Sequence, residues 1–140
     1  MRCRRFYRSM LIKKSLVNLR TWIEIDSSAA RKNYETFRKI IGPKTKLWAV
    51  VKSNAYGHGL VTFSKLLNEF DVDGFCVDSA VEGFTLRRVG IKKPILVLGP
   101  TLPSLLETAV KKKLTLTITN FESLKSLASF VAKKATISGE

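Results

Sequence analysis

Residues 47–59 of the 140-residue chain read LWAVVKSNAYGHG, an apolar stretch that ends in one lysine and a glycine-bounded turn. Residues 47–51 carry no charge and are rich in β-branched and aromatic side chains, which is typical of a buried strand. Lysine is rarely buried, because its ammonium is costly to desolvate without a partner. A strand that leads directly into Lys52 therefore predicts an amine presented to a bound molecule, and a neutral lysine amine forms a Schiff base with an aldehyde.

The turn after the lysine has the composition of a loop that contacts a ligand. Gly57 and Gly59 have no side chain, so the backbone can approach a ligand closely there. Tyr56 adds a hydroxyl four residues after Lys52. The alternative is a solvated surface lysine, which is the commoner outcome at a strand end when position alone is considered.

Apolar strands and amphipathic helices alternate along the rest of the chain. The sequence predicts a first strand over residues 21–25, then a helix that Asp26, Ser27 or Ser28 caps and that Gly42 ends. Further strands are predicted at 46–51, 74–77, 95–98 and 114–118, each followed by a helix. Continuous apolar strands that alternate with helices indicate a parallel sheet covered on both faces.

The predicted fold class is α/β. The alternation fits either a doubly wound sheet or a (β/α)8 TIM barrel, and the first βα loop lacks the Gly-x-Gly-x-x-Gly pattern of dinucleotide folds, which favours the barrel. About four βα units are present, which corresponds to a partial barrel. Pro103 and Asn120 are expected at the starts of the last two helices. The first helix places Tyr34, Phe37, Ile40 and Ile41 on one stripe, and the last helix carries Leu124, Leu127 and Val131.

Charge and composition argue against several kinds of binding partner. The net charge is +14, and residues 1–20 carry seven basic and no acidic side chains. Basic and aromatic residues interleave only at positions 4–8, so no nucleic-acid partner is expected. No apolar stretch reaches the roughly 20 residues that cross a bilayer, so no membrane partner is expected. Cys3 and Cys76 match no metal or redox spacing, which predicts no metal site and fits a cytoplasmic protein.

The lysine stretch is specific enough to suggest a family. Residues 49–59 resemble the pyridoxal-phosphate attachment motif of alanine racemases. The likeness extends over residues 21–130, which contain further matching stretches in the same order: 21–26 with Asn33 and Tyr34, 77–83, Leu86 with Arg87, Gly90 with Ile91, and 94–99. The resemblance implies an N-terminal barrel that carries the cofactor, a C-terminal β-domain and a homodimer.

The same resemblance implies roles for four residues. Lys52 would hold pyridoxal 5′-phosphate and, once freed by the substrate, act as a catalytic base on one face of alanine. Tyr56 would bind the cofactor phosphate, and Val50 and Leu98 would line the cofactor pocket at strand ends. The implied reaction interconverts L-alanine and D-alanine, with D-alanine supplying cell-wall precursors, and the cofactor acts as an electron sink.

The resemblance also implies that part of the machinery lies elsewhere. In the family, the second acid/base is a tyrosine of the C-terminal domain, whereas the tyrosines here are Tyr7, Tyr34 and Tyr56. We therefore expect residues 1–20 to be a disordered basic leader and residues 21–140 to be an incomplete barrel domain, the cofactor-binding half of a racemase without its C-terminal β-domain. The alternatives are a non-catalytic pyridoxal-phosphate-binding protein of the same barrel fold and a basic binding module.

Other polar residues are assigned structural roles. His58, the only histidine, is expected to shape the loop beside the lysine rather than to act in catalysis. Asp71, Asp73 and Asp78 surround the second strand without metal-ligand spacing, and we interpret them as loop and cap residues.

Overall fold

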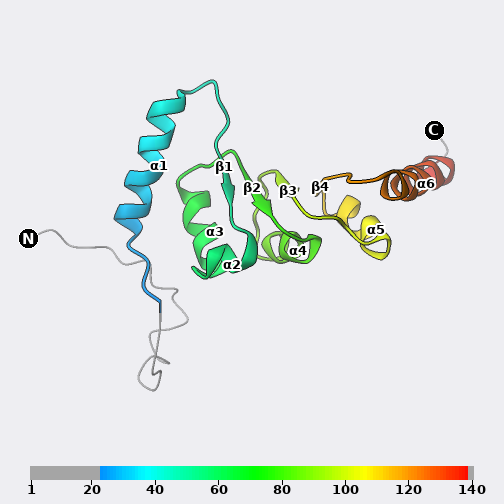
Figure 1. The fold of residues 1–140 in the computed structure, drawn as a ribbon, viewed down its shortest axis with the longest axis horizontal. Helices are drawn as coiled ribbons and strands as arrows, with labels where there is room; N and C mark the ends of the chain where they lie inside the picture. The colour runs from blue at the N-terminus through cyan, green and yellow to red at the C-terminus, as the bar shows by residue number, and fades with distance from the viewer. Residues whose placement is uncertain (1–22, 139–140) are drawn as a thin grey trace, which may run out of the picture.

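The computed structural model describes residues 23–138, so the predicted leader at 1–20 and the first two residues of the predicted strand at 21–25 lie outside it. Helices and strands alternate along the described chain (Figure 1). The elements are α1 (Ser27–Ile41), β1 (Trp48–Val50), α2 (Lys52–Tyr56), α3 (Leu60–Glu69), β2 (Gly74–Val77), α4 (Ala80–Arg88), β3 (Ile95–Val97), α5 (Pro103–Lys111), β4 (Thr115–Leu116) and α6 (Phe121–Ser138).

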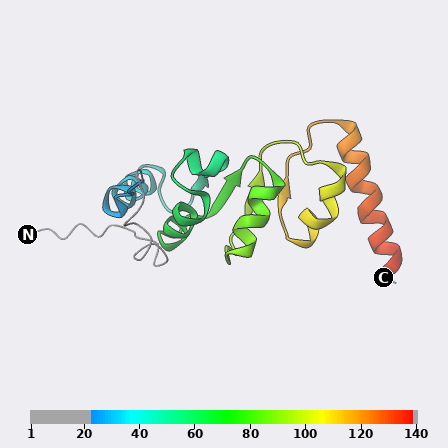
Figure 2. The ribbon, with the colours of Figure 1, turned by 90° about the horizontal axis from the view of Figure 1, so that it is seen from below.

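The four strands form one parallel sheet in the order β1-β2-β3-β4. A doubly wound sheet reverses its strand order at a switch point, whereas a barrel adds each new strand beside the preceding one. The sequential order confirms the predicted partial (β/α)8 fold. The elements follow one another in a row from α1 to α6, so the sheet is open (Figure 2).

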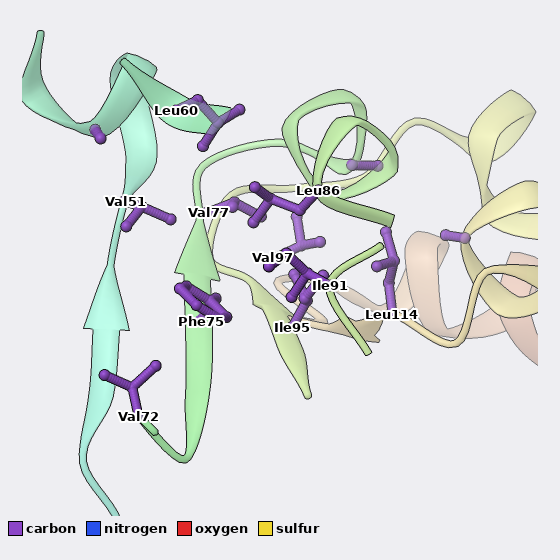
Figure 3. Packing of buried hydrophobic residues seen from close by; sticks show 13 residues of the cluster. Val51, Leu60, Val72, Phe75, Val77, Leu86, Ile91, Ile95, Val97 and Leu114 are labelled. Atoms are coloured by element: carbon purple, nitrogen blue, oxygen red, sulfur yellow. The ribbon is translucent and has the colours of Figure 1, made fainter. Parts of the chain in front are cut away.

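One face of the sheet carries the hydrophobic core. Val51, Phe75, Val77, Ile95 and Val97 are fully buried on this face, and Leu60, Ala80, Leu86 and Ala109 from α3, α4 and α5 belong to the same cluster (Figure 3). Because side chains alternate along a strand, the residues between them point to the opposite face.

That opposite face is only partly covered, which differs from the predicted sheet with two covered faces. Val50 and Leu98 lie there with 44% and 38% of their surface exposed. In a closed barrel this face points inward, and opposing strands cover it. The four described strands supply no such cover.

The first predicted strand is wrong for the described residues. Residues 23–25 form no strand, since no described strand pairs with them. The helix forms as predicted, with the Asp26 carboxylate accepting from the backbone N–H groups of Ser28 and Ala29. However, α1 buries no residue, and Phe37 and Ile40 are 59% and 74% exposed.

Polar contacts attach α1 to the rest of the chain. Arg38 pairs with Asp73, whose carboxylate also accepts from the backbone N–H of Leu47 at 2.7 Å. The Tyr34 hydroxyl donates to the backbone carbonyl of Asp71 at 3.3 Å, and the Arg31 guanidinium lies 4.3 Å from the centre of the Phe70 ring.

At the other end of the chain, β4 is only two residues long. Pro103 occupies the first turn of α5, and the Asn120 side chain accepts from the backbone N–H of Ser123 at the start of α6, as predicted. Leu124 and Val131 of α6 are exposed. No helix in the described part of the chain is long and apolar enough to cross a membrane.

Candidate functional site

Val50 and Leu98 lie on the partly exposed face of the sheet, at the carboxyl ends of their strands, and Lys52 follows β1 as the first residue of α2. Val51 is fully buried on the helix-covered face, so Val50, which precedes it, points away from that core. The same alternation places Leu98 opposite the fully buried Val97. Lys52 is partly exposed.

Immediately after the lysine, the backbone makes a left-handed helical turn. Ser53, Asn54, Ala55 and Tyr56 have φ angles of 52°, 56°, 53° and 52°, and the Ala55 N–H donates to the carbonyl of Val51 at 2.9 Å. This conformation costs about 1–2 kcal/mol for an L-residue with a Cβ, and less for asparagine. Sequence reasoning predicted a glycine-bounded turn here, but not its handedness.

Several contacts offset the cost of this turn. Ala55 is buried at its centre. The Asn54 side chain accepts from the backbone N–H of Leu60, the first residue of α3, at 2.8 Å. The Asn54 carbonyl accepts from both Gly57 and Gly59. Four residues in an unfavourable conformation persist because buried and hydrogen-bonded neighbours define their positions.

Glu82 joins the lysine turn to the next strand. From α4, its Oε1 accepts from the backbone N–H of Asn54 at 3.1 Å, and its Oε2 accepts from the backbone N–H of Asp78 at 3.0 Å. Sequence reasoning missed the role of Glu82. The Ser79-x-x-Glu82 spacing is a capping-box signal that points to a carboxylate near the start of α4, but not to its contact with the lysine turn.

Tyr56 lies at the end of the left-handed turn with 61% of its surface exposed. His58 follows it and has the structural role that the sequence suggested. Its Nδ1 lies 2.8 Å from the carbonyl of Ala55, so it acts as the donor, and its ring stacks on Phe63 at 5.1 Å between centroids. The histidine therefore braces the turn against α3.

The three aspartates around β2 are loop residues, as interpreted. Asp73 pairs with Arg38, which together with the Leu47 N–H lowers the pKa of the Asp73 carboxyl. Asp71 pairs with Lys93, and Asp78 donates its backbone N–H to Glu82. Within residues 23–138, no group of three His, Cys, Asp or Glu side chains could hold a metal ion.

One cavity among the described residues does not include the lysine in its lining. Its volume is about 560 Å³, and it lies between α1, β1 and α3, where Asp26, Tyr34, Trp48 and Phe63 contribute to its lining. Lys52 does not line it. This cavity is therefore distinct from the position of Lys52.

A sequentially ordered parallel sheet with a lysine at the carboxyl end of its first strand defines a protein of the (β/α)8 barrel class, whose functional groups gather at that end of the strands. Within this class, the chain belongs to the family described as alanine racemase, N-terminal domain, whose sequence profile matches residues 25–138.

Curated relatives support this membership. The chain is 42% identical over 112 residues to an alanine racemase of Lactobacillus acidophilus, and this match covers 80% of the chain and 30% of the relative. It is 41% identical over 117 residues to an alanine racemase of Streptococcus equi subsp. equi, with 84% and 30% covered. The chain thus spans about 30% of the length of these relatives.

Solved structures give the same result. Alanine racemase from Oenococcus oeni matches with a TM-score of 0.69 and 37% identity, covering 76% of this chain and 31% of that one. Histidine racemase from Leuconostoc mesenteroides subsp. sake matches with a TM-score of 0.71 and 32% identity, covering 76% and 28%. The resemblance stated from residues 49–59 is confirmed at the level of the family.

Proposed function

We propose that this chain holds pyridoxal 5′-phosphate through Lys52 and forms the cofactor-binding part of an amino-acid racemase, with alanine as substrate. The observation that carries the proposal is the placement of Lys52. It lies between the carboxyl end of β1 and a left-handed turn, in a chain that belongs to the alanine racemase N-terminal family.

The residues present fit the cofactor. Val50 and Leu98 expose apolar surface at strand ends, and such surface suits the flat face of an aromatic ring. Lys52 directly follows β1, and its amine can form a covalent bond with an aldehyde. The exposed hydroxyl of Tyr56 can donate to a phosphate oxygen.

The chemistry divides between the cofactor and the chain. When bound, pyridoxal phosphate supplies the electron sink that stabilises negative charge at the substrate α-carbon. The Nζ atom of Lys52 would accept the α-proton on its own face of the substrate. Racemisation also needs an acid that returns a proton to the opposite face.

A second candidate function is cofactor binding without racemisation by this chain alone. It is favoured by the positions of the described tyrosines. The Tyr34 hydroxyl donates to the carbonyl of Asp71 on the α1 side of the sheet, and Tyr56 is the proposed phosphate ligand. Tyr7 lies outside the described residues. Neither described tyrosine is thus assigned to the opposite face of the substrate.

The remaining parts of the proposal follow the family. We propose residues 21–140 as the barrel-type unit, residues 1–20 as a basic leader, a homodimer as the assembled state and the cytoplasm as the location. The supply of D-alanine to cell-wall precursors would be its role. Similar solved structures bear the names of both alanine and histidine racemases, so substrate choice needs a direct test.

Cofactor attachment is tested by the visible spectrum of the purified chain after incubation with pyridoxal 5′-phosphate and desalting. The band of lysine-bound cofactor should persist in wild type and vanish in Lys52→Ala. Lys65→Ala, which removes an exposed lysine of α3, is the matched control and should keep the band. A band of equal strength in Lys52→Ala would contradict the proposal.

Turnover separates the two candidate functions. Samples of L-alanine and L-histidine are incubated in D₂O with the loaded chain, and deuterium at the α-carbon and the chirality of the product are measured. Deuterium with inversion supports racemisation. A stable Lys52-dependent band with no exchange at either amino acid supports the binding function.

A further inference from the structure

Glu82 accepts a hydrogen bond from the backbone just after Lys52, although the two segments are distant in the sequence. Its carboxylate accepts from Asn54, two residues after the lysine, at 3.1 Å, and from Asp78, directly after β2, at 3.0 Å. The turn α2 and the start of α4 lie at the carboxyl ends of β1 and β2, respectively (Figure 1). One side chain therefore ties together the loops that follow two neighbouring strands.

Lys52 lies between two fixed points of the backbone. On its amino-terminal side, the Val51 N–H donates to the carbonyl of Cys76 in β2 at 2.8 Å. On its carboxyl-terminal side, the Asn54 N–H donates to Glu82. The first bond goes directly to β2, and the second goes to a side chain that also binds the loop after β2. Hydrogen bonds therefore fix the backbone on both sides of Lys52.

The chemistry of the contact requires a carboxylate of glutamate length. Two separate N–H donors are met by the two oxygens of one ionised side chain, and a glutamine has only one acceptor oxygen. Aspartate keeps the charge but is one methylene shorter. Because residues 53–56 adopt an unfavourable left-handed conformation, loss of the Asn54 contact would favour other turn geometries.

We propose that Glu82 is a positioning residue for Lys52: by bridging Asn54 and Asp78, it keeps the left-handed turn and the direction in which the lysine side chain leaves the sheet. The consequence for cofactor capture rests on the proposed function. The effect of Glu82 on the geometry of the turn and of Lys52 does not depend on cofactor binding.

Two variants of Glu82 separate position from charge. Glu82→Gln keeps the size and removes the charge, whereas Glu82→Asp keeps the charge and shortens the reach. Ser79→Ala is the matched control for α4, because it removes the cap hydroxyl that accepts from Glu82 N–H and leaves the bridging carboxylate in place. Glu107→Gln controls for loss of an acidic side chain on another helix, where Glu107 pairs with Lys111.

Two readouts need no cofactor. Hydrogen exchange reports opening at the Asn54 amide, and competitive acetylation of native protein by acetic anhydride gives the labelling ratio of Lys52 to the exposed Lys65. In both Glu82 variants we expect Asn54 to exchange about tenfold faster and the labelling ratio to change about threefold. Both controls should match wild type while all variants keep their far-ultraviolet circular dichroism.

A third readout, the rate at which the lysine-bound cofactor band appears, should fall in both Glu82 variants and not in the controls. Unchanged Asn54 exchange in both Glu82 variants would overturn the proposal, and so would faster exchange with an unchanged labelling ratio. A change in exchange and labelling in Glu82→Gln but not in Glu82→Asp would indicate that the charge of Glu82 matters rather than its position. That result would also overturn the proposal. Absence of the band in wild type would contradict the proposed function but would leave the exchange and labelling results to decide the role of Glu82.

Discussion

Asn54 is the residue on which the lysine turn depends most directly. Its backbone lies in the left-handed region, its side chain accepts from Leu60, and its N–H donates to Glu82. Asparagine tolerates this conformation better than most residues, because its short polar side chain forms local hydrogen bonds. The stretch around Lys52 thus contains a residue suited to the left-handed backbone, as well as residues with reactive side chains.

Asn54→Ala should destabilise the chain by about 1–2 kcal/mol, since it removes the acceptor for Leu60 and places an alanine in the left-handed region. Asn54→Gly should cost less, because glycine adopts this conformation freely. Denaturant unfolding measures both. Ser53→Gly, at an exposed position with φ 52°, is the control and should not destabilise. Equal stability of Asn54→Ala and wild type would contradict this account.

At the scale of elements, α1 is attached by polar contacts and by Tyr34, which packs against the core, whereas Phe37 and Ile40 of the same stripe are exposed. The Arg38 guanidinium and the Leu47 N–H both bind the Asp73 carboxylate and lower its pKa from the ordinary value of 3.8. A carboxyl whose pKa is lowered on folding stabilises the folded arrangement above its unfolded pKa, and this stabilisation is lost as pH falls through the lowered value.

We therefore expect α1 to stay docked near neutral pH and to loosen below about pH 4 as Asp73 takes up a proton. Asp73→Asn should loosen it at neutral pH, because the amide oxygen can still accept from Leu47 but no longer attracts Arg38. Hydrogen exchange of the α1 amides is the measurement. Asp71→Asn, which removes a largely exposed ion-pair partner, should have little effect. Protection in Asp73→Asn equal to wild type would show that other contacts hold the helix.

Arg87 joins the loops that precede β3 and β4. It donates to the backbone carbonyls of Ile91 and Lys93 through Nη1, to Lys112 through Nε and to Lys113 through Nη2, all within 2.9 Å. Burial lowers the pKa of this guanidinium, although an arginine stays charged. These loops lie at the amino ends of the strands, the end of a barrel that serves stability.

Arg87→Lys should destabilise the chain by about 2–3 kcal/mol, because one ammonium group cannot reproduce the planar fork and leaves carbonyls without donors. Arg88→Lys, at the exposed neighbouring position, should be within about 0.5 kcal/mol of wild type. Thermal unfolding compares the two variants. Similar losses of stability in both variants would mean that the planar guanidinium of Arg87 stabilises the fold no more than an ammonium group would.

Over the whole molecule, stability is concentrated on one face of the sheet. Phe75 is fully buried where β2 meets the helices, whereas Phe121 on α6 is 80% exposed. Phe75→Ala should cost about 3–5 kcal/mol through lost burial and a residual cavity, and Phe121→Ala should cost less than about 1 kcal/mol. Denaturant midpoints measure the difference. A loss in Phe121→Ala comparable to that in Phe75→Ala would indicate that α6 is covered in solution.

Much of the fold could be predicted from residues close together in the chain. The caps at Asp26 and Asn120, the proline that starts α5 and the alternation of apolar strands with helices were all predicted and are present. The position of Lys52 at the end of β1 was predicted for the same reason. These features depend on hydrogen bonds and side-chain periods that span only a few residues.

Contacts between distant residues could not be predicted in this way. The left-handed turn needs the carboxylate of Glu82, which lies 28 positions away from Asn54, and the exposure of Phe37 depends on how α1 meets the loops before β1 and β2. Arg87 likewise finds two of its acceptors about 25 residues away. A local pattern specifies which face of an element is apolar. Whether a neighbour covers that face, or supplies the second half of a hydrogen bond, depends on which distant segments the folded chain brings together.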